Sequence, residues 1–248
     1  MTALLRKDGP GLPAVLLHGI GSDAPTWQGV MDRLPHAIAW DAPGYGASPP
    51  VAAARPTPED YARRLAELDL PRAVVVGHSL GCLFAARYAL RHPDRVAALV
   101  LLSPALGYAV PPGAALPEAV QARIDDLDTL GPAAFAEKRA PRLVARMEAL
   151  PGVRRAMAAV NPEGYAQAVH ALGAGDLLAD AALLGLPVLV GVGDADVVTP
   201  PANAQRLHAG LRHPIGPARL IPGSGHALPQ EDPAATAALV MEALRHGG

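Results

Sequence analysis

Short apolar runs, broken by glycine, proline and polar residues, recur along most of the chain. They do not alternate with polar residues, which is typical of strands buried on both faces of a parallel sheet. Segments with apolar residues at helical spacing separate most of these runs. The alternation predicts an α/β fold in which a mostly parallel, doubly wound sheet carries helices on both faces. The predicted core strands are residues 14–17, 37–40, 74–76, 96–102, 187–193 and 218–221.

The helices of the core are predicted wherever apolar residues recur every three or four positions between these strands. Residues 2–6 are predicted as a short edge strand ahead of the first core strand. Proline at the start of a segment, as at Pro25 and Pro58, suits the first turn of a helix. The predicted core helices are residues 25–34, 57–70, 82–90, 201–211 and 233–245.

The alternation of strand and helix stops between residues 107 and 184. Apolar residues there recur at helical spacing, and we expect three to five short helices, inserted as a cap over the carboxyl edge of the sheet. The predicted domains are an α/β core of residues 1–106 and 185–248 and a helical cap of residues 107–184. The expected helix breaks are Pro117, Gly131, Pro132, Pro141, Pro151, Gly152 and Pro162.

The strand at residues 74–76 runs directly into Gly77-His78-Ser79-Leu80-Gly81, which fits the pattern G-x-S-x-G. A predicted helix follows, so the serine lies at the apex of a sharp strand–turn–helix connection. Such a turn lifts the serine oxygen clear of the sheet. Side chains at Gly77 or Gly81 would collide with the neighbouring strand and helix. The structural alternative is a serine that only caps the helix.

Composition narrows the class of protein. The 248 residues carry 21 basic and 23 acidic side chains, a net charge of −2, so neither nucleic acid nor an anionic membrane is an expected partner. Cys82 is the single cysteine, which excludes an intrachain disulfide, and we expect it to be a small buried packing residue. The N-terminus lacks the apolar region of a signal peptide and no run reaches the length of a membrane span, so a soluble, cytoplasmic protein is expected.

A histidine and an acid are needed to make the serine reactive. The histidine takes the hydroxyl proton, and a buried acid orients the histidine. In this type of connection the three residues follow the order serine, acid, histidine. Of nine histidines, only His226 lies after the candidate acids in a glycine-bounded loop that follows a strand. Asp194 and Asp196 both follow the strand at residues 187–193, and their spacing leaves the choice of acid open.

Five ordered blocks of the sequence resemble those of the α/β-hydrolase superfamily. They span nearly the whole chain apart from the insertion, and their joint order is highly specific to that family. The resemblance implies Asp196 as the acid, because it is the fourth residue of the family's G-x-x-D-x-x-x-P block. It also implies an oxyanion hole formed by the backbone N–H groups of Ile20 and Leu80. The blocks are residues 18–21 (His-Gly-Ile-Gly), 41–48 (Asp-Ala-Pro-Gly-Tyr-Gly-Ala-Ser), 77–81 (Gly-His-Ser-Leu-Gly), 193–200 (Gly-Asp-Ala-Asp-Val-Val-Thr-Pro) and 225–226 (Gly-His).

The resemblance implies a serine hydrolase that cleaves carboxylic esters or lactones of small molecules. The reaction would pass through an acyl-enzyme on Ser79, with His226 as general base and Asp196 orienting it. The chemistry is complete without a metal or an organic cofactor, so none is expected. A nucleophilic serine disfavours the reactions of haloalkane dehalogenases and epoxide hydrolases, which use aspartate. Because the segment before the first core strand is short, we expect one or both of the family's early antiparallel strands to be missing.

Three alternatives stay open. Ser79, Asp196 and His226 could equally catalyse the hydrolysis of thioesters, or of carbon–carbon bonds in ring-fission products. Relatives that cleave carbon–carbon bonds usually have Asn and Trp at the positions of His78 and Ala227, which disfavours that activity. The third alternative is a member of the fold that binds small molecules without turnover, and the complete set of three residues argues against it.

The insertion is expected to determine the substrate. Its apolar side chains are predicted to be core rather than pocket lining, and spacing does not show whether Tyr165 points into the site. Its arginines could bind a substrate carboxylate, but acidic residues are about as numerous, which favours a solvated helix face. These apolar residues are Phe135, Met147, Leu150 and Met157, and the arginines are Arg123, Arg139, Arg142, Arg146, Arg154 and Arg155.

Overall fold

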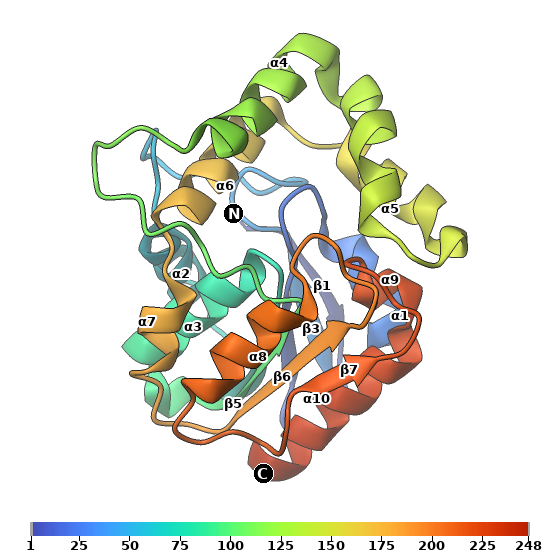
Figure 1. The fold of residues 1–248 in the computed structure, drawn as a ribbon. Helices are drawn as coiled ribbons and strands as arrows, with labels where there is room; N and C mark the ends of the chain where they lie inside the picture. The colour runs from blue at the N-terminus through green and yellow to red at the C-terminus, as the bar shows by residue number, and fades with distance from the viewer. Residues whose placement is uncertain (1, 248) are drawn as a thin grey trace.

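A seven-stranded sheet forms the centre of the computed structural model, which describes residues 2–247 (Figure 1). The strands are β1 (Leu4–Lys7), β2 (Ala14–Leu17), β3 (Ala37–Trp40), β4 (Ala73–His78), β5 (Val96–Leu102), β6 (Val188–Gly193) and β7 (Arg219–Ile221). They lie in the order β1-β3-β2-β4-β5-β6-β7. β1 pairs antiparallel with β3, and every other neighbouring pair is parallel. The mostly parallel sheet predicted from the apolar runs is confirmed.

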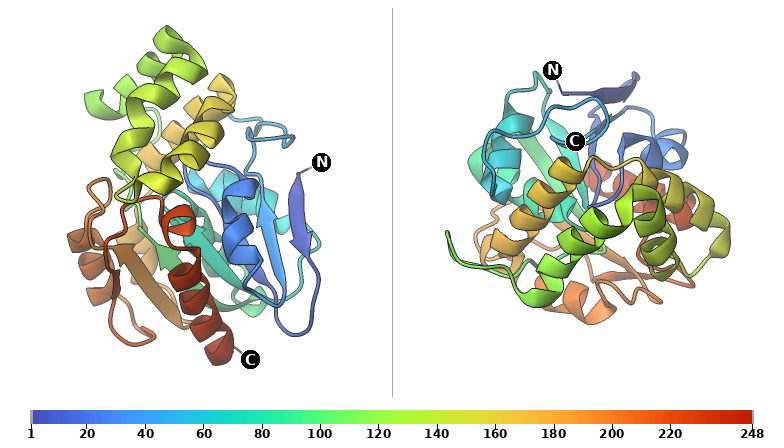
Figure 2. Two further views of the ribbon diagram at one scale, coloured as in Figure 1. Left: turned by 90° about the vertical axis from the view of Figure 1, so that its right-hand side faces the viewer. Right: turned by 90° about the horizontal axis from the view of Figure 1, so that it is seen from above.

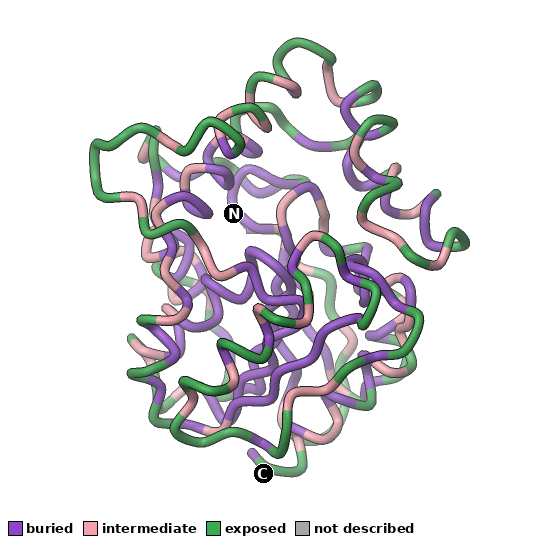
Figure 3. The backbone as a smooth tube through the Cα atoms, viewed as in Figure 1, coloured by how far each residue is buried: buried purple, intermediate pink, exposed green. Residues whose placement is uncertain are grey.

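Helices cover both faces of this sheet. The core helices are α1 (Gln28–Met31), α2 (Pro58–Ala66), α3 (Gly81–Arg91), α8 (Pro201–Ala209), α9 (Leu228–Glu231) and α10 (Pro233–Gly247). Val15 and Leu17 of β2 belong to the apolar core that includes α2, α3 and α8, whereas Ala14 and Leu16 belong to the core that includes α1 and α10. Successive strand residues point to opposite faces, so both faces must be apolar, and Figure 3 shows buried positions following the strands.

The N-terminal region departs from the prediction at its first helix. A 3₁₀ turn, Ala24–Trp27, and the single helical turn α1 replace the one helix expected at residues 25–34. The edge strand expected at residues 2–6 is present as β1, so one early antiparallel strand is retained. Asp41 accepts the Ala24 N–H at 2.8 Å and thereby holds the 3₁₀ turn against the end of β3.

Four helices make up the insertion: α4 (Glu118–Arg139), α5 (Leu150–Ala158), α6 (Pro162–Ala174) and α7 (Leu177–Ala181). α4, α5 and α6 lie over one end of the sheet (Figure 2). A helical insertion is therefore confirmed, while its boundaries as a separate domain at residues 107–184 stay a prediction. α4 kinks at Gly131, whose φ of 71° lies in the left-handed region. Pro151 and Gly152 were expected to break a helix, but they lie in the first turn of α5, where proline is well tolerated.

The buried carboxylate of Glu231, in α9, ties the insertion to the core. Its Oε2 accepts the backbone N–H groups of Ala145 and Arg146 at 2.7 and 2.8 Å. Both of its oxygens lie 3.0 Å from the Gly225 nitrogen, so they share that N–H group. Because Gly225 directly precedes His226, one carboxylate positions both the insertion and the loop that carries the candidate base.

Two expectations from composition can be compared with the structure. Cys82 is buried as predicted, with its sulfur 3.2 Å from the Gly77 carbonyl oxygen. Burial raises the pKa of this thiol well above its ordinary value, as expected of a packing residue. Among residues 2–247, no helix has the length and apolar character needed to cross a membrane.

Asp180 in α7 gives a prediction about stability. Its side chain is 1% exposed, and the Arg87 guanidinium lies 2.9 Å away. Burial outweighs the charge of Arg87 and raises the pKa of Asp180 to about 6. A carboxyl whose pKa is raised on folding contributes most stability below the pKa of the unfolded state, about 3.9, and loses that contribution as the pH rises through the folded value.

We therefore expect Asp180→Asn to become more stable relative to the wild-type protein as the pH rises. The difference in unfolding free energy should change by about 2 kcal/mol between pH 4 and pH 7. Urea unfolding of both proteins across this range measures it. A difference that does not depend on pH would show that the Asp180 carboxyl titrates alike in the folded and unfolded chains.

Candidate active site

Ser79 occupies the turn between β4 and α3 in a strained backbone conformation. Its φ of 53° lies in the left-handed region, which few residues other than glycine adopt. β4 ends at His78 and α3 begins at Gly81, so the turn is as sharp as the sequence pattern predicts. The Ser79 N–H donates to the Leu102 carbonyl oxygen at 2.9 Å, which fixes the turn against the end of β5.

Gly77 and Gly81 leave the space that this turn requires. A Cβ at Gly77 would lie 2.5 Å from the Gly81 carbonyl oxygen, and a Cβ at Gly81 would lie 2.3 Å from the Leu17 carbonyl oxygen. Real Cβ atoms essentially never approach other atoms more closely than 3.0 Å, so a side chain at Gly77 would push α3 away from β4, and one at Gly81 would push α3 away from β2. The predicted collision with the neighbouring helix and strand is confirmed.

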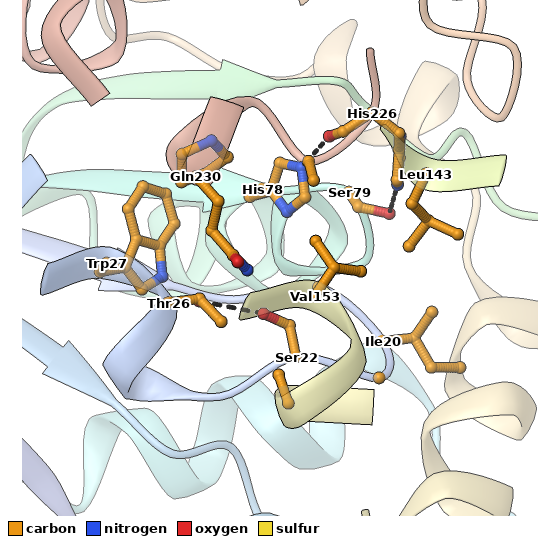
Figure 4. A pocket seen from close by; sticks show the side chains of 15 residues that line it. Ile20, Ser22, Thr26, Trp27, His78, Ser79, Leu143, Val153, His226 and Gln230 are labelled. Carbon is orange, nitrogen blue, oxygen red and sulfur yellow. Dashed lines mark hydrogen bonds between the residues drawn. The ribbon is translucent and has the colours of Figure 1, made fainter. Parts of the chain in front are cut away.

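Three side chains from separate loops form a continuous hydrogen-bonded chain with Ser79 at one end. The Ser79 hydroxyl donates to His226 Nε2 at 3.0 Å (Figure 4). The opposite ring nitrogen, Nδ1, donates to Asp196 Oδ2 at 2.9 Å. All three side chains are buried; Ser79 follows β4, Asp196 follows β6 and His226 follows β7. The sheet thus brings together the serine, the histidine and one of the two acids that the sequence singles out.

Backbone hydrogen bonds hold the Asp196 carboxylate in its charged form. Oδ1 accepts the N–H groups of Val198 and Thr199 at 2.8 and 2.9 Å, and Oδ2 accepts the Thr199 hydroxyl at 2.9 Å. Burial opposes ionisation, but the hydrogen bond and charge of His226 and these backbone donors lower the pKa of Asp196 to about 2. The carboxylate is therefore ionised at neutral pH and can stabilise a positive charge on His226.

Asp194, the other candidate acid, has a different task. Its Oδ1 accepts the Gly223 N–H at 2.8 Å, which joins the loop after β6 to the loop after β7. It has no hydrogen bond to a histidine among residues 2–247. The geometry therefore places Asp196 beside His226 and gives Asp194 a role in holding the two loops together.

His78 supports the site from the position before the serine, which sequence analysis did not single out. Its Nε2–H donates to the His226 carbonyl oxygen at 2.7 Å (Figure 4). Burial, followed by the charge of His226, lowers the pKa of His78 to about 3, so the ring is neutral. The variable positions of G-x-S-x-G carry no signal for such a contact. Together with Glu231, His78 fixes the backbone around the candidate base.

Two backbone N–H groups beside Ser79 are available to a ligand. Ile20 and Leu80 line the same cleft as Ser79, and within residues 2–247 neither N–H donates to another protein group. Leu80 directly follows the serine, whereas Ile20 lies in the loop after β2. That loop passes close to the nucleophile, because a Cβ at Gly19 would lie 2.9 Å from the Ser79 Cβ.

Ser79 and His226 lie where two hollows meet. The larger is a cleft of about 540 Å³ between the edge of the sheet and the insertion, and it reaches Ile20 and Leu80. The smaller has a volume of about 30 Å³, room for roughly one water molecule. Trp27, Thr26 and Gln230 line this smaller hollow (Figure 4). A large substituent therefore fits only in the cleft.

The apolar residues of the insertion divide between core and cleft. Phe135 and Leu150 are buried in the core, as predicted. Met157 is also buried but lines the cleft, and so does Tyr165, whose ring meets that of Phe135 edge-on at 5.2 Å. The prediction was wrong for Met147, which is 58% exposed at the start of a 3₁₀ turn.

The fold and the site match one known family. Residues 14–239 of the chain match the family described as "Alpha/beta hydrolase family". The chain belongs to this family. The resemblance stated from the five sequence blocks is confirmed, as is the α/β-hydrolase fold with its helical insertion. Among residues 2–247, no cluster of three or more His, Cys, Asp or Glu side chains is arranged to hold a metal ion.

Esterases and a lactonase are among the proteins similar to this α/β hydrolase. A malate-bound thermophilic esterase from Thermogutta terrifontis is 26% identical, with a TM-score of 0.83 over 100% of this chain and 95% of that one. The enol-lactonase from Burkholderia xenovorans LB400 is also 26% identical, with a TM-score of 0.84 over 98% and 97% of the two chains. The protein is therefore a hydrolase of this family with esterase-type relatives.

A curated relative matches over a shorter stretch. The pimeloyl-[acyl-carrier protein] methyl ester esterase of Vibrio vulnificus (strain YJ016) is 42% identical over 101 residues, which is 40% of this chain and 39% of that protein. The match thus spans well under half the length of either protein. It supports esterase-type chemistry, and it leaves the substrate of this hydrolase to be argued from the site.

Proposed function

We propose that this α/β hydrolase cleaves carboxylic esters or lactones of small molecules through an acyl-enzyme on Ser79. The observation that carries the proposal is the buried chain from Asp196 through His226 to the strained serine, with contacts of 2.9 and 3.0 Å. A serine held in this way has a base within proton-transfer distance and an ionised acid behind that base. A serine, a base and an ionised acid arranged in this way can catalyse the transfer of an acyl group to the serine and then to water.

The first half of the reaction forms the acyl-enzyme. Ser79 Oγ bonds to the substrate carbonyl carbon as His226 Nε2 takes its proton, and Asp196 stabilises the resulting imidazolium. The N–H groups of Ile20 and Leu80 donate to the oxygen that becomes negative, and each such donor is worth about 3 kcal/mol in the transition state. When the carbon–oxygen bond breaks, His226 gives its proton to the departing alcohol oxygen.

The second half returns the enzyme to its starting state. Water attacks the acyl carbon as His226 takes one of its protons, and the same two N–H groups stabilise the second oxyanion. His226 then protonates Ser79 Oγ as the acid leaves. For a lactone, the alcohol and the acid belong to one product molecule. No other proton donor or acceptor is needed.

Two observations favour carbon–oxygen bonds over the alternatives. The esterase and the enol-lactonase are similar to this chain over nearly its whole length. In addition, His78 and Ala227 occupy the positions at which carbon–carbon bond hydrolases usually have Asn and Trp. The Nε2–H group of His78 already donates a hydrogen bond to the His226 carbonyl oxygen.

A substrate panel tests the proposed function. The panel contains a short-chain ester, a lactone, an acyl thioester and a ring-fission 1,5-diketone, each assayed with native enzyme and with enzyme blocked by a fluorophosphonate. We expect kcat/KM for the ester or the lactone to exceed that for the other substrates by at least about tenfold, and the block to abolish turnover. Turnover confined to the thioester or the diketone, or turnover that survives the block, would contradict the proposal.

A further inference from the structure

The six arginines of the insertion fall into two sets in the structure. Arg146, Arg154 and Arg155 form ion pairs outside the cleft, with Asp232 at 3.1 Å, Glu137 at 3.1 Å and Asp23 at 2.6 Å respectively. Arg123, Arg139 and Arg142 line the cleft above Ser79. Arg123 and Arg139 are partly buried where the insertion lies over the sheet, whereas Arg142 is exposed, as a solvated face predicts.

Two further cations complete the lining of this cleft. Lys138 comes from the insertion, and Arg206 comes from α8 of the core, on the other side of the opening. In the part of the chain that the structure describes, no aspartate or glutamate lines the cleft. Five positive side chains thus surround an opening that leads directly to Ser79 and His226.

Little negative charge compensates these five cations. Asp126 is the shared partner of Lys138, at 2.8 Å, and of Arg139, at 3.6 Å. Arg123, Arg142 and Arg206 have no carboxylate oxygen within 4.0 Å among residues 2–247. Three of the five cations therefore have no ion-pair partner and the other two share one carboxylate, which leaves a surplus of positive charge.

This surplus is local to the cleft. The whole chain carries a net charge of −2, so basic composition does not explain five cations around one opening. Gathering like charges costs stability through their mutual repulsion, and the low-dielectric walls of a cleft strengthen the field inside it. A bound anion would relieve the repulsion, and the guanidinium group is well suited to carboxylate and phosphate.

We propose that the part of the substrate lodged in this cleft carries a carboxylate or a phosphate, held by Arg123, Arg142 and Arg206 while the ester lies at Ser79. This inference rests on the proposed function and narrows its substrate to acidic esters. Arg123 and Arg142 approach from the insertion and Arg206 from the core, so one anion would be held between the two. Arg139 contributes less, because it stacks over Phe135 at 5.4 Å and pairs with Asp126.

Matched pairs of acidic and neutral esters test the proposal. Monomethyl adipate is compared with methyl hexanoate, and the acetate ester of glycerol phosphate with glycerol monoacetate. These pairs separate a carboxylate on the acyl side from a phosphate on the alcohol side. For at least one pair, we expect the acidic ester to have a kcat/KM about tenfold or more above its neutral partner, mainly through a lower KM. This preference should weaken as salt is added, because ions screen the attraction.

Single-charge variants show which residues carry the preference. Arg123→Gln, Arg142→Gln and Arg206→Gln each remove one cation from the cleft, and each should lower the ratio of acidic to neutral kcat/KM by about tenfold. Arg154→Gln is the matched control, since it removes the same charge from the same insertion but outside the cleft. It should keep the wild-type ratio.

The outcomes separate this inference from the proposed function. Hydrolysis of the neutral esters without preference for either acidic partner would overturn the anion site and leave the proposed function standing. An equal loss of preference in Arg154→Gln would overturn it too. If no ester is hydrolysed, the proposed function fails, and calorimetry with adipate and with glycerol phosphate then decides the anion site alone. The anion site is supported if the wild-type protein binds adipate or glycerol phosphate and the affinity falls about tenfold in Arg123→Gln, Arg142→Gln and Arg206→Gln. Equal affinity in the wild-type protein and these variants contradicts it.

Discussion

Replacement of Ser79 by alanine is expected to lower kcat/KM for a simple ester by a factor on the order of 10⁵. The variant removes the oxygen that would form the acyl-enzyme, and His226 is left without the hydroxyl that lies 3.0 Å from its Nε2. The fold should survive, because alanine keeps the Cβ and the backbone bond to Leu102 is unaffected. Initial rates with the ester and the circular dichroism spectrum measure the two effects.

Ser103 provides a matched control for this variant. It is also a fully buried serine with a positive φ, 43°, at the end of a strand, but its hydroxyl has no hydrogen-bond partner among residues 2–247. Ser103→Ala should keep the wild-type rate of ester hydrolysis and should not lose stability, because an unpaired buried hydroxyl makes no favourable hydrogen bond. Turnover retained in pure Ser79→Ala would remove Ser79 from the mechanism.

Replacement of Asp196 by asparagine is expected to lower kcat by about 10³- to 10⁴-fold with little change in shape. An asparagine amide cannot neutralise the imidazolium, and it permits the ring to turn or to adopt the wrong tautomer. The variant should also lose stability above about pH 4. The pKa of Asp196, lowered to about 2, means that its ionised form favours the folded state there, and this contribution disappears as the pH falls toward 2.

Asp194→Asn is the control for this prediction, two residues away in the same loop. Asparagine can still accept the Gly223 N–H through its amide oxygen, so activity should remain within about threefold of the wild-type protein. Rates of ester hydrolysis for the two variants decide between the acids. A severe loss in Asp194→Asn, with activity retained in Asp196→Asn, would reverse their assignment.

The turn that carries Ser79 and the candidate base His226 could both be predicted, because each rests on a local sequence pattern. Ser79 lies between an apolar run and a helical repeat, and His226 lies in a glycine-bounded loop after the last strand. The acid is different, since Asp194 and Asp196 leave the same strand. Spacing does not show that the chain turns back at Val198 and Thr199, whose N–H groups hold Asp196 beside His226. The family resemblance supplied that choice.

The insertion shows where a pattern in the sequence stops being informative. Helical spacing predicted its helices, but Pro151 starts α5 rather than breaking a helix, because the first turn needs no N–H from that position. The same spacing does not distinguish Arg123, which lines the cleft, from Arg154, which pairs with Glu137 outside it. That difference depends on how the insertion packs over the sheet, which involves residues far apart in the chain.

Peptide mapping after reaction with a fluorophosphonate tests the central claim most directly. The reagent attaches to a serine that is activated by a base, so its position reports the nucleophile without knowledge of the natural substrate. We expect the label on the peptide that contains Ser79, no label on that peptide in Ser79→Ala, and slower labelling in Asp196→Asn. An unlabelled Ser79 peptide in folded wild-type protein, or a label on a different serine, would contradict an acyl-enzyme at Ser79.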